Sequence, residues 1–329
     1  MKLLVTGSAG FIGCNFVREI AETRAGWSVV SLDKLTYAGN LANLDGVARH
    51  ELVRGDIAIA ADVERAFERG PFDAVVHFAA ESHVDRSIES GDEFARTNVL
   101  GTQVLLSAAR RHSPKRFLHV STDEVYGSLG PSGHFLETTP LDPTSPYAAS
   151  KAASDLMVLA AVKTWKLPAI VTRCSNNFGP YQFPEKAIPL FVTNAMQDRP
   201  LPVYGDGSNV REWLHVRDHA RAILAVLENG ADGEIYNIGS GEERRNIDIA
   251  KLIVATLGKP ESLITFVTDR LAHDRRYAVD STKLRVKLGW NPQVKFEPGI
   301  AETIAWYRAN EPWWRDILSG AYKARNART

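Results

Sequence analysis

The sequence contains a pair of residues suited to moving a proton. Tyr147 and Lys151 are four positions apart in an alanine-rich stretch, so both side chains lie on one face of the predicted helix. The pKa of a free tyrosine is ~10, and a nearby ammonium group stabilises the ionised form. We therefore expect Tyr147 to act as a base toward an alcohol, with Lys151 lowering the pKa of Tyr147.

Thr122, Asp123 and Glu124 add a hydroxyl and two carboxyl groups at the end of a predicted strand. Neighbouring residues of an uninterrupted strand point to opposite faces. Both carboxyl groups can serve one substrate only if the strand ends at about Thr122 and the chain turns, which the following residues 125–128 allow. The alternative is that Asp123 and Glu124 only cap the loop.

Two carboxyl groups beside an alcohol-oxidising tyrosine indicate proton transfers at further carbon atoms, because oxidation alone needs no second acid or base. Oxidation at C4 of a hexose makes the C5 proton acidic. One carboxylate can then remove that proton, while the other, protonated, assists loss of the C6 hydroxyl as water. Thr122 is expected to hydrogen-bond the C4 oxygen, and the hydride taken from C4 can return to C6.

Glycines at positions 7, 10 and 13 follow the first predicted strand and open the first predicted helix. Such a loop lets the backbone approach a diphosphate, and the helix N-terminus offers free N–H groups. Asp33 ends the second predicted strand, where a carboxylate accepts hydrogen bonds from ribose and repels a 2′-phosphate. The sequence therefore predicts NAD rather than NADP, and the positive ring of NAD would also lower the pKa of Tyr147. The residues expected to contact NAD are Gly7, Gly10, Phe11, Ile12, Gly13, Asp33, Asp56, Ile57, Ala79, Ala80, Tyr147 and Lys151.

Short apolar stretches alternate with helical stretches in the first half of the chain, which favours a Rossmann-type doubly wound parallel sheet. A smaller, partly interleaved C-terminal substrate lobe is expected to follow. We expect an NAD-binding domain over residues 1–172, with returning segments near 210–240, and a mainly nucleotide-sugar-binding lobe over 173–329. Strands are predicted at 3–5, 27–33, 51–56, 73–79, 116–121 and 169–172, and helices at 15–22, 61–69, 94–111, 147–165, 188–197, 216–228 and 248–257.

The composition excludes several classes of protein. Lysine plus arginine and aspartate plus glutamate number 39 each, so nothing indicates nucleic-acid binding. The two cysteines, Cys14 and Cys174, are too few for a disulfide scaffold, and no apolar run approaches the ~18 residues of a membrane span. Glycine comes too early at the N-terminus for a signal peptide. We expect a cytoplasmic protein without a metal site.

Over almost its whole length the sequence resembles the dTDP-glucose 4,6-dehydratases, a family of the extended short-chain dehydrogenase/reductase superfamily. The glycine loop and the Tyr-x-x-x-Lys pair identify only the superfamily, whereas the Thr-Asp-Glu triplet and the stretch 176–186 are specific to the dehydratases. The segments that carry the resemblance are 7–13, 78–87, 121–127, 146–151, 176–186, 204–207, 211–213 and 273–277.

The resemblance implies dehydration of dTDP-glucose to dTDP-4-keto-6-deoxyglucose by a homodimer that recycles NAD. Asp123 would protonate the C6 hydroxyl, Glu124 would be the base at C5, and Tyr147 would be the base at the C4 hydroxyl. Leu271 and Ala272 stand where the family usually has Pro-Gly, which puts the nucleotide preference or turnover in question. The residues implied in substrate binding are His83, Thr122, Asn176, Glu185, Lys186, Arg211, Asn246, Arg270 and His273.

Two other functions remain open from the residues. A nucleotide-sugar 4-epimerase or decarboxylase of the same superfamily would share the cofactor loop and Tyr147. An epimerase would not need Asp123 and Glu124 together, and a decarboxylase should place extra cations near a C6 carboxylate. An NAD-binding scaffold without catalysis is the third reading, which the intact Tyr147, Lys151, Asp123 and Glu124 disfavour.

Overall fold

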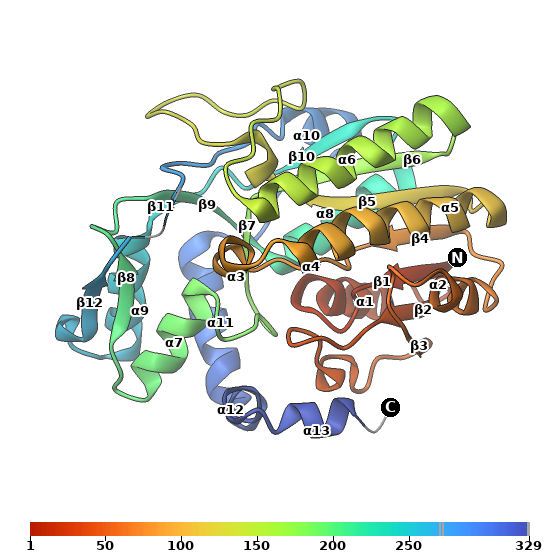
Figure 1. The fold of residues 1–329 in the computed structure, drawn as a ribbon. Helices are drawn as coiled ribbons and strands as arrows, with labels where there is room; N and C mark the ends of the chain where they lie inside the picture. Colours follow the sequence, from red (N-terminus) through yellow and green to blue (C-terminus); the bar gives the residue numbers. More distant parts are fainter. Residues whose placement is uncertain (270, 272, 328–329) are drawn as a thin grey trace.

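The computed structural model describes residues 1–269, 271 and 273–327. Among these residues, seven parallel strands form one sheet in the order β10-β6-β5-β4-β1-β2-β3 (Figure 1). This confirms the doubly wound parallel sheet predicted from the sequence. The strands are β1 (Lys2–Thr6), β2 (Ser28–Asp33), β3 (His50–Arg54), β4 (Ala74–His77), β5 (Arg116–Thr122), β6 (Ala169–Cys174) and β10 (Ile235–Ile238).

Helices cover both faces of this sheet and bury an apolar core on each side. The alternating sequence pattern produces this arrangement because each strand is apolar on both faces and each helix on one. One face packs against α1 (Phe11–Thr23), α8 (Val216–Asn229) and α10 (Thr282–Leu288). The other packs against α2 (Ala60–Phe67), α5 (Thr102–His112) and α6 (Pro146–Trp165).

The C-terminal half also builds a smaller lobe with its own apolar core (Figure 1). Two small sheets lie in it, with the orders β11-β9-β7 and β12-β8. The strands are β7 (Asn176–Phe178), β8 (Leu201–Tyr204), β9 (Val210–His215), β11 (Glu243–Arg245) and β12 (Ile264–Val267), and the helices α7 (Ala187–Met196), α9 (Asn246–Leu257), η4 (Glu261–Leu263), α11 (Phe296–Ala309) and α12 (Glu311–Ser319).

The end of the chain returns to the N-terminal half. Helix α13 (Tyr322–Asn326) lies near the loop that follows β2, which also contains the short helix η1 (Leu41–Leu44). The Tyr322 hydroxyl donates to the carbonyl of Tyr37 at 2.6 Å. The loop beside the first strands is therefore held from the far end of the sequence.

The helix predicted over 94–111 is present, but its first part is π-helical rather than α-helical. The structure has α3 (Val84–Glu89), α4 (Asp92–Phe94) and a π-helical turn, η2 (Ala95–Gly101), before α5 begins. The turn buries Asn98, whose amide accepts from the Glu81 N–H at 2.9 Å and donates to the Glu81 carbonyl at 3.0 Å. It also donates to Ser150 Oγ at 2.8 Å. This tertiary contact outweighs the α-helical pattern, and π turns of this kind are frequent at functional sites.

None of the helices in the described part of the chain is long and apolar enough to cross a membrane.

Candidate active site

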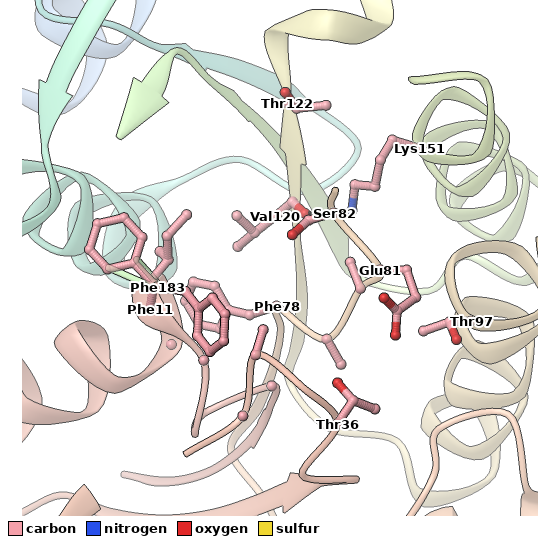
Figure 2. Close-up of a pocket in the computed structure, with 18 of the residues that line it drawn as sticks. Phe11, Thr36, Phe78, Glu81, Ser82, Thr97, Val120, Thr122, Lys151 and Phe183 are labelled. Carbon is pink, nitrogen blue, oxygen red and sulfur yellow. Dashed lines mark hydrogen bonds between the residues drawn. The ribbon is translucent and has the colours of Figure 1, made fainter. Parts of the chain in front are cut away.

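A cavity of about 310 Å³ opens at the carboxyl ends of β1, β2, β4 and β5 (Figure 2). Ligands bind at this edge in doubly wound sheets. Figure 2 shows Phe11 at one side of the cavity and Thr122 and Lys151 at the other. The structure brings these predicted residues together in its wall: Gly7, Gly10, Phe11, Ile12, Gly13, Asp33, Asp56, Ile57, Ala79, Ala80, Thr122, Asp123, Glu124, Tyr147, Lys151, Asn176, Glu185 and Lys186.

The glycine loop is shaped so that it leaves backbone N–H groups facing the cavity. Gly7 has φ +73°, and a Cβ there would lie 2.6 Å from the Ala79 nitrogen. Gly10 caps α1 without a side chain, so the first-turn N–H groups from Phe11 onward have no side-chain acceptor within the helix. These N–H groups and the partial positive charge of the helix end fit the diphosphate of a dinucleotide.

The close packing of this loop yields a prediction at Gly13. A Cβ at Gly13 would lie 2.2 Å from the Gly7 oxygen, whereas one at Gly10 would lie 3.3 Å from the same atom. Gly13→Ala should therefore destabilise the protein by roughly 1–3 kcal/mol through overpacking, and Gly10→Ala by clearly less. Melting temperatures of both variants check this, and equal melting temperatures for Gly13→Ala and the parent would contradict it.

Asp33 ends β2 inside the cavity, where it is buried. Its Oδ2 accepts from the Ala9 N–H and its Oδ1 from the Leu35 N–H, both at 2.8 Å. Burial raises the pKa of Asp33, and the two N–H groups oppose that rise. Each oxygen keeps a further lone pair, so the carboxylate fits the ribose hydroxyls of NAD.

Asp56 follows β3 and is engaged by two cations. Its Oδ2 lies 2.7 Å from Arg96 Nη1 and 3.0 Å from Lys34 Nζ, and its Oδ1 accepts from the Ala58 N–H at 2.8 Å. Burial works against ionisation, but Ala58, Arg96 and Lys34 together lower the pKa of Asp56. Asp56 is thus an ionised carboxylate in the cavity wall, and a contact with adenine stays a prediction.

The turn predicted after Thr122 is present. β5 ends at Thr122, and a 3₁₀ helix, η3 (Asp123–Tyr126), follows at once. The Thr122 hydroxyl caps this helix by accepting from the Glu124 N–H at 3.3 Å and donates to Asp123 Oδ1 at 3.2 Å. Both carboxyl groups therefore reach the same cavity, which an uninterrupted strand would prevent.

Burial favours the protonated form of Asp123. It is only 1% exposed, and its Oδ2 has no hydrogen-bond partner among the described residues. Burial, then the charges of Glu124 and Glu212, raise its pKa well above the ordinary value, while Arg211 and Thr122 oppose the rise. A carboxyl group in this state can donate a proton at neutral pH.

Tyr147 lies in the first turn of α6, which Ser145 and Pro146 start. Burial, then the charge of Glu124, raise the pKa of Tyr147 well above the ordinary value, and a hydrogen bond with Thr122 opposes this. Desolvation of the phenolate decides the direction of this shift in the protein alone, and the lowering expected from Lys151 stays a prediction.

Lys151 reaches from α6 toward β5 (Figure 2), and its ammonium donates to the Val120 carbonyl at 2.9 Å. Burial lowers its pKa from 10.5 to about 8, opposed by Asp155 and Cys174. Lys151 is therefore a cation at neutral pH, but one close to losing its proton.

The stretch after β7 brings further polar groups to the cavity. Asn176 Oδ1 and Glu185 Oε1 are buried and have no hydrogen-bond partner among the described residues. Lys186 Nζ donates to the Ser82 carbonyl at 2.9 Å, and His83 Nε2 lies 3.8 Å from Glu185 Oε2. Unpartnered buried oxygens beside a lysine suit a hydroxylated, anionic ligand.

Arg211, Asn246 and His273, which were also predicted to bind the substrate, lie outside the wall of this cavity. Arg211 donates to the Asp274 carbonyl at 2.9 Å and stacks 4.4 Å from the Tyr277 ring centre, close enough to Asp123 to affect its pKa. Asn246 begins α9, and His273 Nδ1 lies 2.6 Å from Asp269. Substrate contacts of these residues stay predictions, and Arg270 and Ala272 lie outside the described residues.

Sequence reasoning missed Tyr37 and Arg86 near the cavity. Tyr37 is in the wall, and the Arg86 guanidinium lies 3.6 Å from its ring centre while donating to Glu185 Oε2 at 3.2 Å. The sequence could have indicated Tyr37, because this residue follows closely after Asp33, the aspartate that ends β2. Its contact with Arg86 joins segments far apart in sequence.

The chain was compared with known proteins. A family model described as GDP-mannose 4,6 dehydratase matches residues 4–303. The dTDP-glucose 4,6-dehydratase of Xanthomonas campestris pv. campestris is 54% identical, with 97% of each chain covered. The one of Neisseria meningitidis serogroup B is 51% identical over 98% of this chain and 97% of the relative.

Solved structures agree with these relatives. DesIV, a dTDP-glucose 4,6-dehydratase from Streptomyces venezuelae solved with NAD, superposes with a TM-score of 0.93 at 51% identity, covering 96% of this chain and all of that one. The UDP-glucose 4-epimerase of Thermus thermophilus, also with NAD, gives 0.88 at 31% identity, covering 94% and 100%. The chain therefore belongs to the NAD-dependent dTDP-glucose 4,6-dehydratases, hydro-lyases with a Rossmann-type fold.

Proposed function

We propose that this protein dehydrates dTDP-glucose to dTDP-4-keto-6-deoxyglucose through Tyr147, Asp123 and Glu124. The proposal is supported by the turn after β5, since Asp123, whose pKa is raised by burial, and Glu124 line one cavity with Tyr147. NAD held by the glycine loop and Asp33 would supply the hydride chemistry at C4 and C6. The residues of this chain handle the protons.

Tyr147 takes the proton of the C4 hydroxyl, and Thr122 orients the same oxygen. Because burial raises the pKa of Tyr147, the phenol must first lose its own proton to solvent. The positive charge of NAD, when bound, and the Lys151 ammonium would favour that loss. The C5 proton, made acidic by the new ketone, goes to Glu124, which would return it to C5 when C6 is reduced. Asp123 gives its proton to the C6 hydroxyl, which leaves as water.

Binding roles are assigned on the same basis. We propose that Gly7, Gly10, Gly13 and Asp33 hold NAD, and that Asn176, Glu185 and Lys186 hold the sugar and diphosphate. His83, Arg211, Asn246 and His273 are proposed to complete the nucleotide-sugar site from outside the cavity wall. The corresponding domains would be residues 1–172 with the returning segments near 210–240, and 173–329.

The function is tested with a panel of dTDP-, UDP-, CDP- and GDP-glucose in the presence of NAD. We expect a 4-keto-6-deoxy product, detected by its absorbance in base, with dTDP-glucose preferred. Recovery of the galactose isomer would instead identify a 4-epimerase, the class of the Thermus structural relative. No conversion of any of these sugars would contradict the proposal.

We also propose that the protein is a homodimer that acts in the cytoplasm. Leu100 of η2 and Leu156 of α6 are 49% and 57% exposed on neighbouring helices, an apolar face suited to a second copy. Both cysteines are free and buried, which suits a reducing compartment. Light scattering should give twice the mass of the chain for the parent and a monomer mass for Leu156→Glu. A monomeric parent would contradict the homodimer.

A further inference from the structure

A buried carboxylate lies one helical turn beyond Lys151 and outside the wall of the cavity. Asp155 follows Lys151 by four positions on α6, so both side chains share one face of that helix. Asp155 is completely buried and Lys151 is 4% exposed. Asp155 Oδ2 accepts from Arg173 Nε at 2.8 Å, whereas its Oδ1 has no hydrogen-bond donor within the described part of the chain.

The ion pair with the buried Arg173 is by itself weak evidence that this carboxylate stabilises the fold. A buried ion pair is costly to desolvate, and apolar residues of similar volume often replace one without loss. Asp155 Oδ1 lies 3.4 Å from His119 Nε2, but burial lowers the pKa of His119 to about 4, so this ring is neutral at neutral pH. Arg173 is thus the cation that contacts this carboxylate, and Lys151 is a second cation whose charge interacts with it.

Three titratable groups on the neighbouring strands that interact with Lys151 carry no charge at neutral pH. His77 of β4, like His119 of β5, has its pKa lowered by burial. Burial raises the pKa of the Cys174 thiol on β6, so this group stays protonated. Burial opposes the ionisation of Asp155 too, but His119, Arg173 and Lys151 together lower the pKa of Asp155 below its ordinary value. Of the two groups that raise the pKa of Lys151, only Asp155 is therefore an anion.

We propose that Asp155 is a positioning residue for the reaction, acting as the buried counter-charge that keeps Lys151 a cation beside Tyr147. The inference rests on the proposed function, in which Lys151 supports ionisation of Tyr147. Asp155 touches neither the cavity nor Tyr147 and acts only through Lys151. Because the pKa of Lys151 is already down at about 8, loss of this one anion would leave a neutral amine near neutral pH.

The first test is the pH dependence of kcat for dTDP-glucose turnover. In Asp155→Asn the alkaline limb should move to lower pH by about one unit or more, so that kcat falls about tenfold or more at a pH well above the parent limb, with a smaller change in KM. Arg173→Lys is the matched control, because it disturbs the same ion pair and the stacking on Tyr126 but keeps both charges. Its alkaline limb should stay within a few tenths of a unit of the parent.

A second readout is independent of activity. Lys151 has a lower pKa in the folded protein than in the unfolded chain, so between about pH 8 and 10.5 the unfolded chain binds more protons and stability rises with pH. Asp155→Asn should extend this rise to lower pH in melting curves. Lys151→Met should abolish the rise of stability with pH that comes from Lys151. Asp155→Asn made in the Lys151→Met variant should then cause no further change in the pH dependence of the melting temperature.

The outcomes separate the two claims. A parent that does not convert dTDP-glucose would contradict the proposed function, whatever the melting curves show. A working parent with an unmoved alkaline limb in Asp155→Asn would overturn the role of Asp155. An equal shift of the alkaline limb in Arg173→Lys would also overturn this role, since Asp155 would then act through general packing. The role would be overturned as well if Asp155→Asn still changed the pH dependence of the melting temperature in a Lys151→Met background, since Asp155 would then act through another group.

Discussion

Glu124→Gln should stop the reaction after oxidation at C4. The amide keeps the size of the side chain but cannot accept the C5 proton, so water is not eliminated and hydride has no C6 acceptor. Turnover should fall by roughly 10²–10⁴-fold, as expected for loss of a general base. A stoichiometric amount of reduced cofactor should build up on the protein when dTDP-glucose is added, measured by its nicotinamide absorbance.

The control for this variant is Glu137→Gln, which makes the same change outside the cavity wall. Glu137 Oε1 accepts from the Asn237 N–H at 3.1 Å, a contact that an amide oxygen can also make. Turnover of Glu137→Gln should stay within about twofold of the parent, as is usual away from a functional site. Normal product formation by Glu124→Gln would remove Glu124 from the mechanism and leave Asp123 as the acting carboxyl group.

The fold was predictable because its signals are local. Strands of near-continuous apolar residues, helices between them and glycines at fixed spacing each report on a short stretch of backbone. The turn at Thr122 was also predictable, because the proposed chemistry requires Asp123 and Glu124 to face the same cavity. In the structure η3 makes this turn directly after β5. The predicted cofactor loop and catalytic residues accordingly line one cavity.

The electrostatic state of the site was not predictable, because it depends on burial and on partners distant in sequence. Lys151 was expected to lower the pKa of Tyr147, but complete desolvation of the phenol decides the direction in the protein alone. Asp155 and Arg173 are 18 positions apart, so their contact becomes visible only once α6 packs on β6. The π turn at Asn98 has the same origin, since its amide binds Glu81 and Ser150.

Tyr147→Phe should block the reaction one step earlier than Glu124→Gln. Phenylalanine keeps the ring and its edge contact with Phe94, at 6.4 Å between centres, but removes the group that takes the C4 hydroxyl proton. Turnover should fall by roughly 10²–10⁴-fold, and addition of dTDP-glucose should now produce no reduced cofactor. Tyr236→Phe is the matched control, because its hydroxyl is also buried but only accepts from the Ala231 N–H at 3.1 Å.

The two variants together order the steps. If Tyr147 starts the reaction, the double variant Tyr147→Phe, Glu124→Gln should behave like Tyr147→Phe and accumulate no reduced cofactor, since Glu124 acts only on a ketone that Tyr147 has made possible. Reduced cofactor in the double variant would show that another group, such as Thr122 with a water, takes the C4 proton. Because Tyr147 begins protonated in a buried site, the rate of cofactor reduction in Glu124→Gln should also rise with pH until Tyr147 is ionised. A pH-independent rate of reduction would contradict its role as the base.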